Sequence, residues 1–462
     1  MALSADERVA ADLRRRAERA RPGTRLPSVR DLSAVHGASP VTVQRALARV
    51  AAEGIVVAYP GRGTFVAERR SEPREPVDYG WQSIALGGRG VDAGGLDRVL
   101  AIPEEGTISL AGGFPGSSLL PHGLVAAAGA RAARKPSSWS RLPLAGLADL
   151  RAWFAREVGN DVSGDDVLVT SGGQSALSIV FRALGRPGDP VIVESPTYVG
   201  ALAAARAAGL EAVPVAVDPD GINVDYLEAT LRRTRARVVV LQPTCANPHG
   251  AVLSPERRER IHELAARFRT FVVEDEYARD LVYEPPAPPP LVSADRNGHV
   301  VYVRSLTKST APGLRVAGLI ARGPARDRLQ SAWIVNDFFV SGLLQQTALE
   351  VVTSPAWQRH LRTLRKELVL RRDALIDALG RHLPGWRPFC RPRGGLALWI
   401  ELPAGTPDDE TLVRRAAAAG VLVVPGSLWF AAEAPGRFIR LSYAAATVPE
   451  LDEAARRLAR AL

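Results

Sequence analysis

Lysine is scarce in this chain, and one of its few lysines follows a predicted strand. The sequence has 59 Lys and Arg residues, of which only Lys135, Lys308 and Lys366 are lysine. Lys308 ends the segment Ser305-Leu306-Thr307-Lys308, shortly after the β-branched run at 300–303. A lysine amine can form a Schiff base, whereas a guanidinium cannot because it is never deprotonated in proteins. Lys308 is therefore a candidate nucleophile, with an ordinary surface lysine as the alternative.

Further motifs with polar side chains stand at the ends of predicted strands. Ser171-Gly172-Gly173-Gln174 lies between a strand and a helix, where glycines let backbone N–H groups approach a phosphate. Glycines at this point are also typical of a plain turn. Arg315 follows Lys308 and offers a forked, permanently charged partner for a phosphate. The remaining two motifs are Asn247-Pro248-His249-Gly250 and Glu274-Asp275-Glu276-Tyr277.

Short β-branched runs alternate with alanine-rich helical stretches from residue 167 onward. This rhythm predicts an α/β fold, in which a mostly parallel sheet has helices on both faces. Ligands bind such sheets beyond the carboxyl ends of the strands, which is where the motifs lie. The predicted strands are 167–170, 191–193, 213–217, 238–241, 271–273, 300–303 and 316–320.

This set of motifs resembles the fold-type I aminotransferases, which use pyridoxal 5′-phosphate. The resemblance implies that Lys308 forms an aldimine with the cofactor. Asp275 would pair with the pyridine nitrogen, which keeps the ring protonated and makes it an electron sink. Asn247 and Tyr277 would lie near the phenolic oxygen, Tyr198 would stack on the ring, and Lys308, Asp275 and Tyr277 would be catalytic. The other implied cofactor-binding residues are Gly172 and, at the phosphate, Gly173, Gln174, Ser305 and Arg315.

The resemblance extends to positions away from these strand ends. Arg440, within 438–442, matches the arginine that grips the substrate carboxylate, in a smaller C-terminal α+β domain. Gly113-Phe114-Pro115 matches the mobile segment at the active-site entrance of that family. The chain departs from the family pattern at one place. Relatives usually have Tyr-Gly there, whereas this chain has Trp139-Ser140. The tyrosine that would reach the phosphate of the neighbouring subunit is therefore expected to be absent. His249 is interpreted as a surface turn histidine, with contact to an effector as the alternative.

The first 70 residues have the pattern of a winged helix-turn-helix. Ser28 and Ser39 are placed to cap the second and third helices, and Gly37 to end the second. The third helix begins with exposed polar side chains, as a recognition helix does. A turn that contains Arg62 gives the wing a basic tip. The predicted elements are helices at 6–20, between Ser28 and Gly37 (built on Val29, Leu32 and Val35) and at 40–53, and strands at 55–58 and 64–66.

The order of these residues resembles the GntR family of winged-helix regulators. The resemblance rests on Leu26-Pro27-Ser28-Val29-Arg30, Thr42-Val43, Glu53-Gly54 and Gly61-Arg62-Gly63-Thr64-Phe65-Val66. At Pro40 that family usually has arginine, so one phosphate or base contact is expected to be absent. Phosphate contacts would position the domain, and side chains at the start of the third helix would read base edges. The implied DNA-binding residues are Ser28, Arg30, Ser39, Val41, Thr42, Gln44, Arg45, Arg62 and Gly63.

Charge and composition limit the cellular locations and the kinds of partner that the sequence allows. Residues 1–76 hold 14 Arg and 9 acidic residues, about half of the net charge of +10, which suits a polyanion, with a basic solvated face as the alternative. No apolar run is long enough to span a membrane, and acidic residues interrupt any signal-peptide pattern. Cys245 and Cys390 give no metal-ligand spacing and no disulfide framework, which favours a reducing compartment such as the cytoplasm.

Together the two resemblances span nearly the whole chain and match the MocR-type GntR regulators. The implied domains are the winged helix-turn-helix at 1–70, a linker and entry segment at 71–106, the cofactor-binding large domain at 107–357 and the small domain at 358–462. Residues 67–78 are charged and contain two prolines, as an exposed connector does. The glycine-rich segment that follows, to about residue 107, gives no assignable element.

Three functions are compatible with this organisation. The first is a transcriptional regulator that binds double-stranded DNA as a homodimer and senses an amino compound, or pyridoxal phosphate itself, through an aldimine at Lys308. The alternative is an active aminotransferase, which moves an amino group from an amino acid to a 2-oxo acid, with an appended DNA-binding domain. A DNA-binding protein whose large domain has lost its cofactor is disfavoured, because the cofactor positions are filled.

Overall fold

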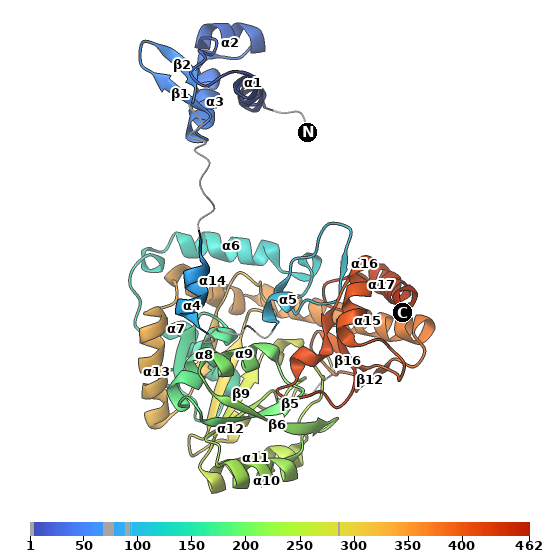
Figure 1. Cartoon of the computed structure of the whole chain (residues 1–462). Helices are drawn as coiled ribbons and strands as arrows, with labels where there is room; N and C mark the ends of the chain where they lie inside the picture. The colour runs from blue at the N-terminus through green and yellow to red at the C-terminus, as the bar shows by residue number, and fades with distance from the viewer. Residues whose placement is uncertain (1–3, 68–77, 88–92, 94, 285–286) are drawn as a thin grey trace. The chain divides into compact units, whose positions relative to one another are not determined.

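Two compact units make up the chain in the computed structural model, residues 1–90 and 91–462 (Figure 1). The structure describes residues 4–67, 78–87, 93, 95–284 and 287–462. Most of the connector predicted at 67–78, and the domain boundary predicted at 70/71, lie outside the described residues. Each unit has a hydrophobic core of its own.

The first unit packs helices α1 to α3 around a small core and adds a two-stranded wing. Ser28 and Ser39 cap α2 and α3 through their side chains, and Gly37 ends α2 in the left-handed conformation, with φ of 59°. Leu32 is fully buried, but the two-turn helix α2 buries no other residue and leaves Val35 66% exposed. The elements are α1 (Ala5–Arg19), α2 (Val29–His36), α3 (Pro40–Ala52), β1 (Val56–Tyr59), β2 (Gly63–Val66) and, after the connector, α4 (Gly80–Leu86).

Within the described residues, the second unit is built on an eight-stranded sheet in the order β4-β11-β10-β9-β8-β5-β6-β7. The strands from β10 to β6 run parallel, while β11 is antiparallel to both of its neighbours and β7 to β6. The mostly parallel sheet predicted from the sequence is thus confirmed. The strands are β4 (Val167–Thr170), β5 (Pro190–Ser195), β6 (Glu211–Asp218), β7 (Gly221–Ile222), β8 (Val238–Leu241), β9 (Phe271–Glu276), β10 (Val300–Ser305) and β11 (Ala317–Ile320).

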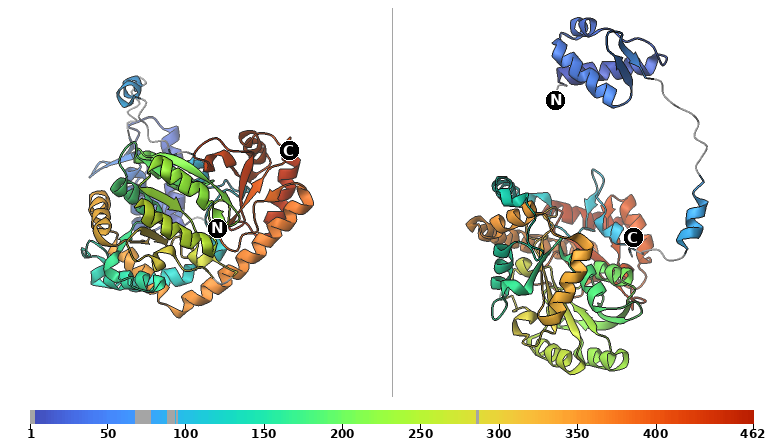
Figure 2. Two further views of the ribbon diagram at one scale, coloured as in Figure 1. Left: turned by 90° about the horizontal axis from the view of Figure 1, so that it is seen from below. Right: turned by 90° about the vertical axis from the view of Figure 1, so that its left-hand side faces the viewer.

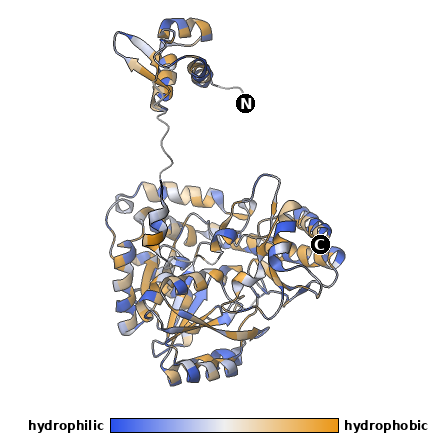
Figure 3. Cartoon of the chain, in the orientation of Figure 1, coloured by the Kyte–Doolittle hydropathy of each residue, from blue (hydrophilic) through white to orange (hydrophobic). Residues whose placement is uncertain are grey.

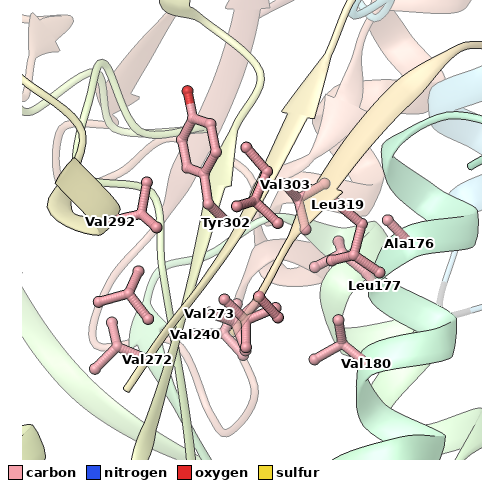
Figure 4. Packing of buried hydrophobic residues seen from close by; sticks show 14 of the residues in the cluster. Ala176, Leu177, Val180, Val240, Val272, Val273, Val292, Tyr302, Val303 and Leu319 are labelled. Atoms are coloured by element: carbon pink, nitrogen blue, oxygen red, sulfur yellow. The ribbon is translucent and has the colours of Figure 1, made fainter. Parts of the chain in front are cut away.

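Helices cover both faces of this sheet (Figure 2). Leu177 and Val180 of α8 pack on one side of the strands, and Val292 of α12 lies on the other (Figure 4). The helices carry hydrophilic as well as hydrophobic residues, as expected when one face meets the core and the other meets water (Figure 3). The helices are α6 (His122–Ala133), α7 (Ala148–Val158), α8 (Gly173–Leu184), α9 (Val199–Ala207), α10 (Val224–Thr234), α11 (Pro255–Phe268), α12 (Leu291–Ala294), α13 (Gly323–Asp337) and α14 (Gly342–Val352).

A smaller antiparallel sheet, four-stranded in the part of the chain that the structure describes, has the order β12-β13-β16-β15. A short parallel pair between β3 and β14 brings the segment after β3 next to it. Its elements are β3 (Ile108–Ser109), β12 (Arg387–Pro388), β13 (Ala397–Glu401), β14 (Val421–Leu422), β15 (Val424–Pro425), β16 (Phe438–Ser442), α5 (Leu96–Leu100), α15 (Pro355–His382), α16 (Asp409–Ala418) and α17 (Val448–Ala461). Short 3₁₀ turns are η1 (Ser117–Leu119), η2 (Pro136–Ser138), η3 (Gly164–Asp166), η4 (Arg279–Leu281) and η5 (Gly426–Trp429).

The 28-residue helix α15 joins the two parts of the second unit. Its residues Trp357 and Leu361 belong to the core beneath the large sheet, whereas Leu364 and Leu368 belong to the core of the small sheet. Position 358, where the sequence analysis begins the small domain, lies inside this helix. Among the helices that the structure describes, none is long and apolar enough to cross a bilayer.

Candidate functional site

A cavity opens where the strands of the large sheet end. It holds about 1060 Å³ of empty space, counting its opening to solvent. Parallel strands end at the same edge of a sheet, so motifs far apart in the sequence meet there. Gly172 does not line the cavity. The predicted cofactor and effector residues that do are Gly173, Gln174, Tyr198, Asn247, Asp275, Tyr277, Ser305, Lys308, Arg315 and Arg440.

Lys308 is held in surroundings that favour its neutral form. The ring of Phe114, whose centroid lies 3.4 Å from Nζ, favours the charged amine, but the other neighbours outweigh it. Burial, together with the positive charges of Arg440 and Arg315, lowers the pKa of Lys308 to about 7, although the carboxylate of Asp275 opposes the shift. A large share of the amine is therefore unprotonated at neutral pH, which is the form that attacks an aldehyde.

The capture of pyridoxal phosphate by cofactor-free protein is expected to depend on pH accordingly. With a pKa of about 7, the neutral fraction of the Lys308 amine rises from roughly a tenth at pH 6 to roughly nine tenths at pH 8. The capture rate, followed by stopped-flow absorbance, should therefore climb about tenfold over this range and then level off. N-acetyl-lysine amide in the same buffers should keep accelerating toward pH 10. A protein rate that also climbs past pH 9 would contradict the lowered pKa.

Gln242, which the sequence analysis did not single out, fixes the carboxylate at the centre of the site. Its Nε2 donates to Oδ2 of Asp275 at 2.7 Å, and its Oε1 accepts from the backbone N–H of Asn247 at 2.8 Å. Burial raises the pKa of Asp275 to about 6, while the hydrogen bond from Gln242 and the charge of Lys308 hold it down. Asp275 is therefore mostly ionised at neutral pH, as a partner for a protonated ring nitrogen must be.

Replacing Gln242 by leucine is expected to weaken pyridoxal phosphate binding about 10- to 100-fold at neutral pH, since a hydrogen bond to a charged group is lost. The pKa of Asp275 would rise further, so the loss should be larger at pH 6 than at pH 8.5. An absorbance titration at both pH values measures it. Gln358→Leu, at an exposed position of α15, serves as the control. A loss that is equal at the two pH values would mean that Gln242 has only a structural role.

The opposite end of the cavity is built to hold an anion. Gly172 has φ of 91°, and a Cβ atom there would lie 2.8 Å from Nη2 of Arg315. Gly173 begins α8, whose first backbone N–H groups have no partner within the helix. The hydroxyl of Ser305 and the guanidinium of Arg315 lie at the same end. Amides at a helix start, a hydroxyl and a guanidinium together fit a phosphate group.

Arg440 is a buried cation without an acidic partner among the described residues. It is 3% exposed, its Nη1 donates to the carbonyl of Ala111 at 2.9 Å, and its Nε has no hydrogen-bond partner. Its guanidinium lies 5.1 Å from the ring centroid of Trp429, and burial lowers its pKa to about 10. A Cβ atom at Gly113 would lie 3.6 Å from both Arg440 Nη2 and Lys308 Nζ. A buried cation of this kind, on the lining of a cavity, is suited to bind an anionic ligand.

The remaining predicted residues of the cavity are neutral hydrogen-bonding groups. Tyr277 donates its hydroxyl proton to the carbonyl of Cys245 at 2.7 Å. Tyr198 precedes α9, and burial raises its pKa to about 12, so its phenol stays neutral. Gln174 donates from Nε2 to the carbonyl of Gly200 at 2.8 Å. Tyr277 and Gln174 are therefore held in place by backbone carbonyls before any ligand binds.

The interpretation of His249 as a surface residue is wrong. It is 1% exposed, and burial lowers its pKa to about 3. The turn around it packs beneath the small sheet, where the Cys390 thiol donates to the carbonyl of His249 and the ring of Phe389 meets the imidazole edge to face. His249 does not line the cavity. Trp139, the other unusual residue, is 69% exposed and also stands apart from the cavity lining.

The predicted DNA-binding residues of the first unit lie at helix starts, in the wing turn and on exposed helix and wing positions. Ser28, Ser39 and Thr42 form caps: Ser28 Oγ accepts from the N–H of Asp31, and Ser39 Oγ from that of Thr42, both at 3.2 Å. Gly63 lies in the wing turn at φ of 110°. Ser28 and Ser39 are themselves exposed, and the other exposed side chains of the set are Arg30, Val41, Gln44, Arg45 and Arg62.

A further exposed arginine lies beside the wing. Arg25 pairs with Phe65 in an isolated β-bridge, and a Cβ atom at Gly63 would lie 2.9 Å from its Nε. The Arg62 guanidinium stacks at 5.8 Å over the ring of Tyr59 on the other side of the turn. The wing therefore carries a second cation that the sequence pattern did not reveal, because the bridge joins residues 40 positions apart.

Comparisons with known proteins agree with this architecture. Residues 5–66 match the bacterial regulatory proteins of the gntR family, and residues 114–458 match aminotransferase class I and II. The uncharacterized HTH-type transcriptional regulator YjiR of Escherichia coli is 32% identical over 89% of this chain and 88% of its own length. The probable rhizopine catabolism regulatory protein MocR of Rhizobium meliloti is 26% identical, over 91% of this chain and 86% of its own length.

Among solved structures, the α-aminoadipate aminotransferase LysN of Thermus thermophilus is similar. It was crystallised with N-(5′-phosphopyridoxyl)-L-leucine. The two chains are 33% identical, the match covers 82% of this chain and 98% of LysN, and the TM-score is 0.75. The chain therefore belongs to the aminotransferase class I and II family, whose cofactor is pyridoxal phosphate, and to those members that carry a gntR-type DNA-binding domain at the N-terminus.

Proposed function

We propose that this protein is a transcriptional regulator whose second unit binds pyridoxal phosphate and an amino compound, and whose occupancy changes how the first unit binds DNA. The observation that carries the proposal is the pairing, in one cavity, of a lysine with a lowered pKa and a buried arginine without an acidic partner among the described residues. The regulators named above, which share both parts of the chain, support the DNA-binding role.

Each residue of the site has a role in this proposal. Pyridoxal phosphate, when bound, supplies an aldehyde carbon attached to an electron-withdrawing ring. Lys308 would hold that carbon, and Asp275 would keep a proton on the ring nitrogen. Tyr277 and Asn247 would lie beside the phenolic oxygen. Arg440 would bind the carboxylate of the amino compound. The phosphate would be held by Gly173, Gln174, Ser305 and Arg315, with Gly172 leaving the space that Arg315 needs.

A homodimer is part of the proposal, and exposed apolar side chains support it. Val335 and Phe338, at the end of α13, are 86% and 70% exposed, and Trp139 is 69% exposed. Gly342 packs against Ser138, so these segments belong to one region of the second unit. Surfaces of this kind mark protein contacts. Light scattering at micromolar concentration should give twice the mass of the chain.

A cytoplasmic location follows if the protein acts on DNA.

An active aminotransferase is the second candidate, favoured by the complete set of Lys308, Asp275 and Arg440 in the cavity. The visible spectrum of the cofactor-loaded protein, followed while amino acids are added one at a time, separates the two. A band that shifts and stays shifted, with no 2-oxo acid released, supports a sensor. A band that decays to that of the amine form of the cofactor, and returns when a 2-oxo acid is added, means that the protein transfers amino groups.

Replacing Arg62 or Gln44 by alanine is expected to affect DNA binding in different ways. Arg62, at the wing tip, should contact phosphate, so Arg62→Ala should weaken binding to all sequences and reduce the salt slope by about one. Gln44 should read a base, so Gln44→Ala should cost about 1–3 kcal/mol on the selected site only. Fluorescence anisotropy on a duplex selected by the wild-type protein, and on random duplex, measures both. Arg460→Ala, exposed on α17, should change neither. Equal salt slopes for the Arg62 and Gln44 variants would contradict this division.

A further inference from the structure

The cavity has two chemically different walls. The wall formed at the strand ends of the large sheet carries the polar groups, among them Gln242, Asn247, Asp275 and Ser305. The facing wall comes from α5, the entrance segment and the small sheet, and Arg440 is its one charged residue among those described. Apart from Arg440 and Gly113, this wall consists of Leu96, Val99, Leu100, Phe114, Leu396 and Trp429.

Helix α5 is anchored so that its apolar side faces the cavity. Val99 is 7% exposed and packs in one hydrophobic cluster with Trp429 and Val199. The only basic residue of α5, Arg98, forms an ion pair at 2.6 Å with Glu410 on α16 and does not line the cavity. Leu100, at the rim, is 55% exposed. The position of α5 is therefore set by contacts on both sides of it, and it presents leucine and valine to the ligand.

The charged groups of the cavity are all assigned to other parts of the ligands. The charged residues lining it are Lys308, Arg315, Arg440 and Asp275. In the proposed function Arg315 meets the phosphate, Asp275 the ring nitrogen, Lys308 the aldehyde carbon and Arg440 the carboxylate of the amino compound. Within the described lining, no cation is left for a second carboxylate, and no anion for a second amine. A charged side chain would be desolvated on this wall without a partner, which is costly.

We infer that the amino compound is an α-amino acid with an uncharged, branched or aromatic side chain, which lies against α5 and Trp429. This inference rests on the proposed function and narrows its ligand. The carboxylate on Arg440 fixes the orientation, because Trp429 lies directly beside that guanidinium at 5.1 Å. Gly113, next to Phe114 of the apolar wall, lies close to both Lys308 Nζ and Arg440 Nη2, so an α-carbon held between these two groups would direct its side chain toward that wall. Dicarboxylic and diamino acids have no ionic partner there among the described residues, since the one unpartnered polar atom of Trp429, its indole N–H, is neutral.

The test is a spectroscopic titration of the full-length protein loaded with pyridoxal phosphate. L-leucine and L-phenylalanine are each compared with L-glutamate, L-2-aminoadipate and L-lysine, and the visible band gives the apparent affinity. We expect the apolar amino acids to bind about 100-fold more tightly than the charged ones, since burial of an unpaired charge is penalised. Affinity for glutamate or aminoadipate equal to that for leucine would overturn the inference.

A rim substitution tests where the side chain lies. Leu100→Arg adds a cation at the half-exposed end of the apolar wall, so affinity for glutamate and aminoadipate should improve about tenfold while leucine binding weakens. Leu370→Arg is the matched control, because Leu370 is 57% exposed on α15 and does not line the cavity. If Leu100→Arg changes the preference no more than Leu370→Arg does, α5 is not the side-chain wall and the inference fails.

The two proposals fail in different ways. If no amino acid alters the band of the loaded protein, the proposed sensing function is wrong. If charged amino acids alter the band as strongly as apolar ones, an amino compound is bound but its class is not the one inferred. Thermal denaturation with each amino acid gives a readout that does not depend on the spectrum, because a ligand that binds the folded state raises its stability.

Discussion

Lys308→Ala is expected to abolish both retention of the cofactor after desalting and the response to amino acids. Among the described residues, Lys308 supplies the only amine in the cavity lining, and its lowered pKa makes it reactive at neutral pH. The fold should not suffer, because the substitution removes an amine that burial and two neighbouring guanidinium groups disfavour in its charged form. The measurement is the visible spectrum before and after gel filtration, together with thermal denaturation of the cofactor-free protein.

The scarcity of lysine makes this prediction easy to check. Lys366→Ala, at an exposed position of α15, should keep the spectrum of the wild type. Borohydride reduction of the loaded protein should attach the cofactor at a single peptide, the one that contains Lys308. Label on Lys135 or Lys366 instead, or a visible band that survives in Lys308→Ala, would overturn the assignment of the nucleophile.

Arg440→Met is expected to weaken the binding of α-amino acids about 100-fold or more. Truncating one partner of a buried charge pair costs about 2–5 kcal/mol, and Arg440 is the one cation of the described lining left for the ligand carboxylate. Stability should stay level or rise, because a buried charge without an acidic partner in the described chain is replaced by an apolar side chain of similar length. Titrations with L-leucine and thermal denaturation measure the two effects.

The matched ligand for this variant is 3-methylbutylamine, which is leucine without its carboxylate. Wild type should prefer leucine strongly, whereas Arg440→Met should bind the two compounds almost equally. If the variant loses affinity for the amine as much as for leucine, Arg440 supports the shape of the cavity and does not bind the carboxylate.

The sequence predicts the strands and the residues at their ends well. A strand that is buried on both faces appears in the sequence as a short run of apolar residues, and the polar residues at the end of that run mark its carboxyl end. Lys308 and Asp275 are found in this way, and the parallel topology then brings them together. The helices of the winged helix-turn-helix are predicted equally well, because Ser28 and Ser39 cap helix starts and Gly37 ends a helix through local backbone chemistry.

Residues whose role depends on packing between distant parts of the chain are poorly predicted by sequence patterns. Helix α5 lies in a glycine-rich segment, and its contacts with Trp429 form across more than 300 positions. Gln242 belongs to no motif, although a polar residue directly after β8, beside the strand that carries Asp275, is a signal that could have found it. His249 was misjudged because a turn with Asn, Pro and Gly is usually exposed, whereas here the small sheet packs over it.

Helix α15 links the two hydrophobic cores of the second unit. Its first turns complete the core under the large sheet and its later turns complete the core of the small sheet. Because one continuous helix contributes to both cores, we expect their unfolding to be coupled. The first unit, which has a core of its own, is free to unfold at a different temperature. Loss of DNA binding on heating therefore need not accompany loss of the cofactor.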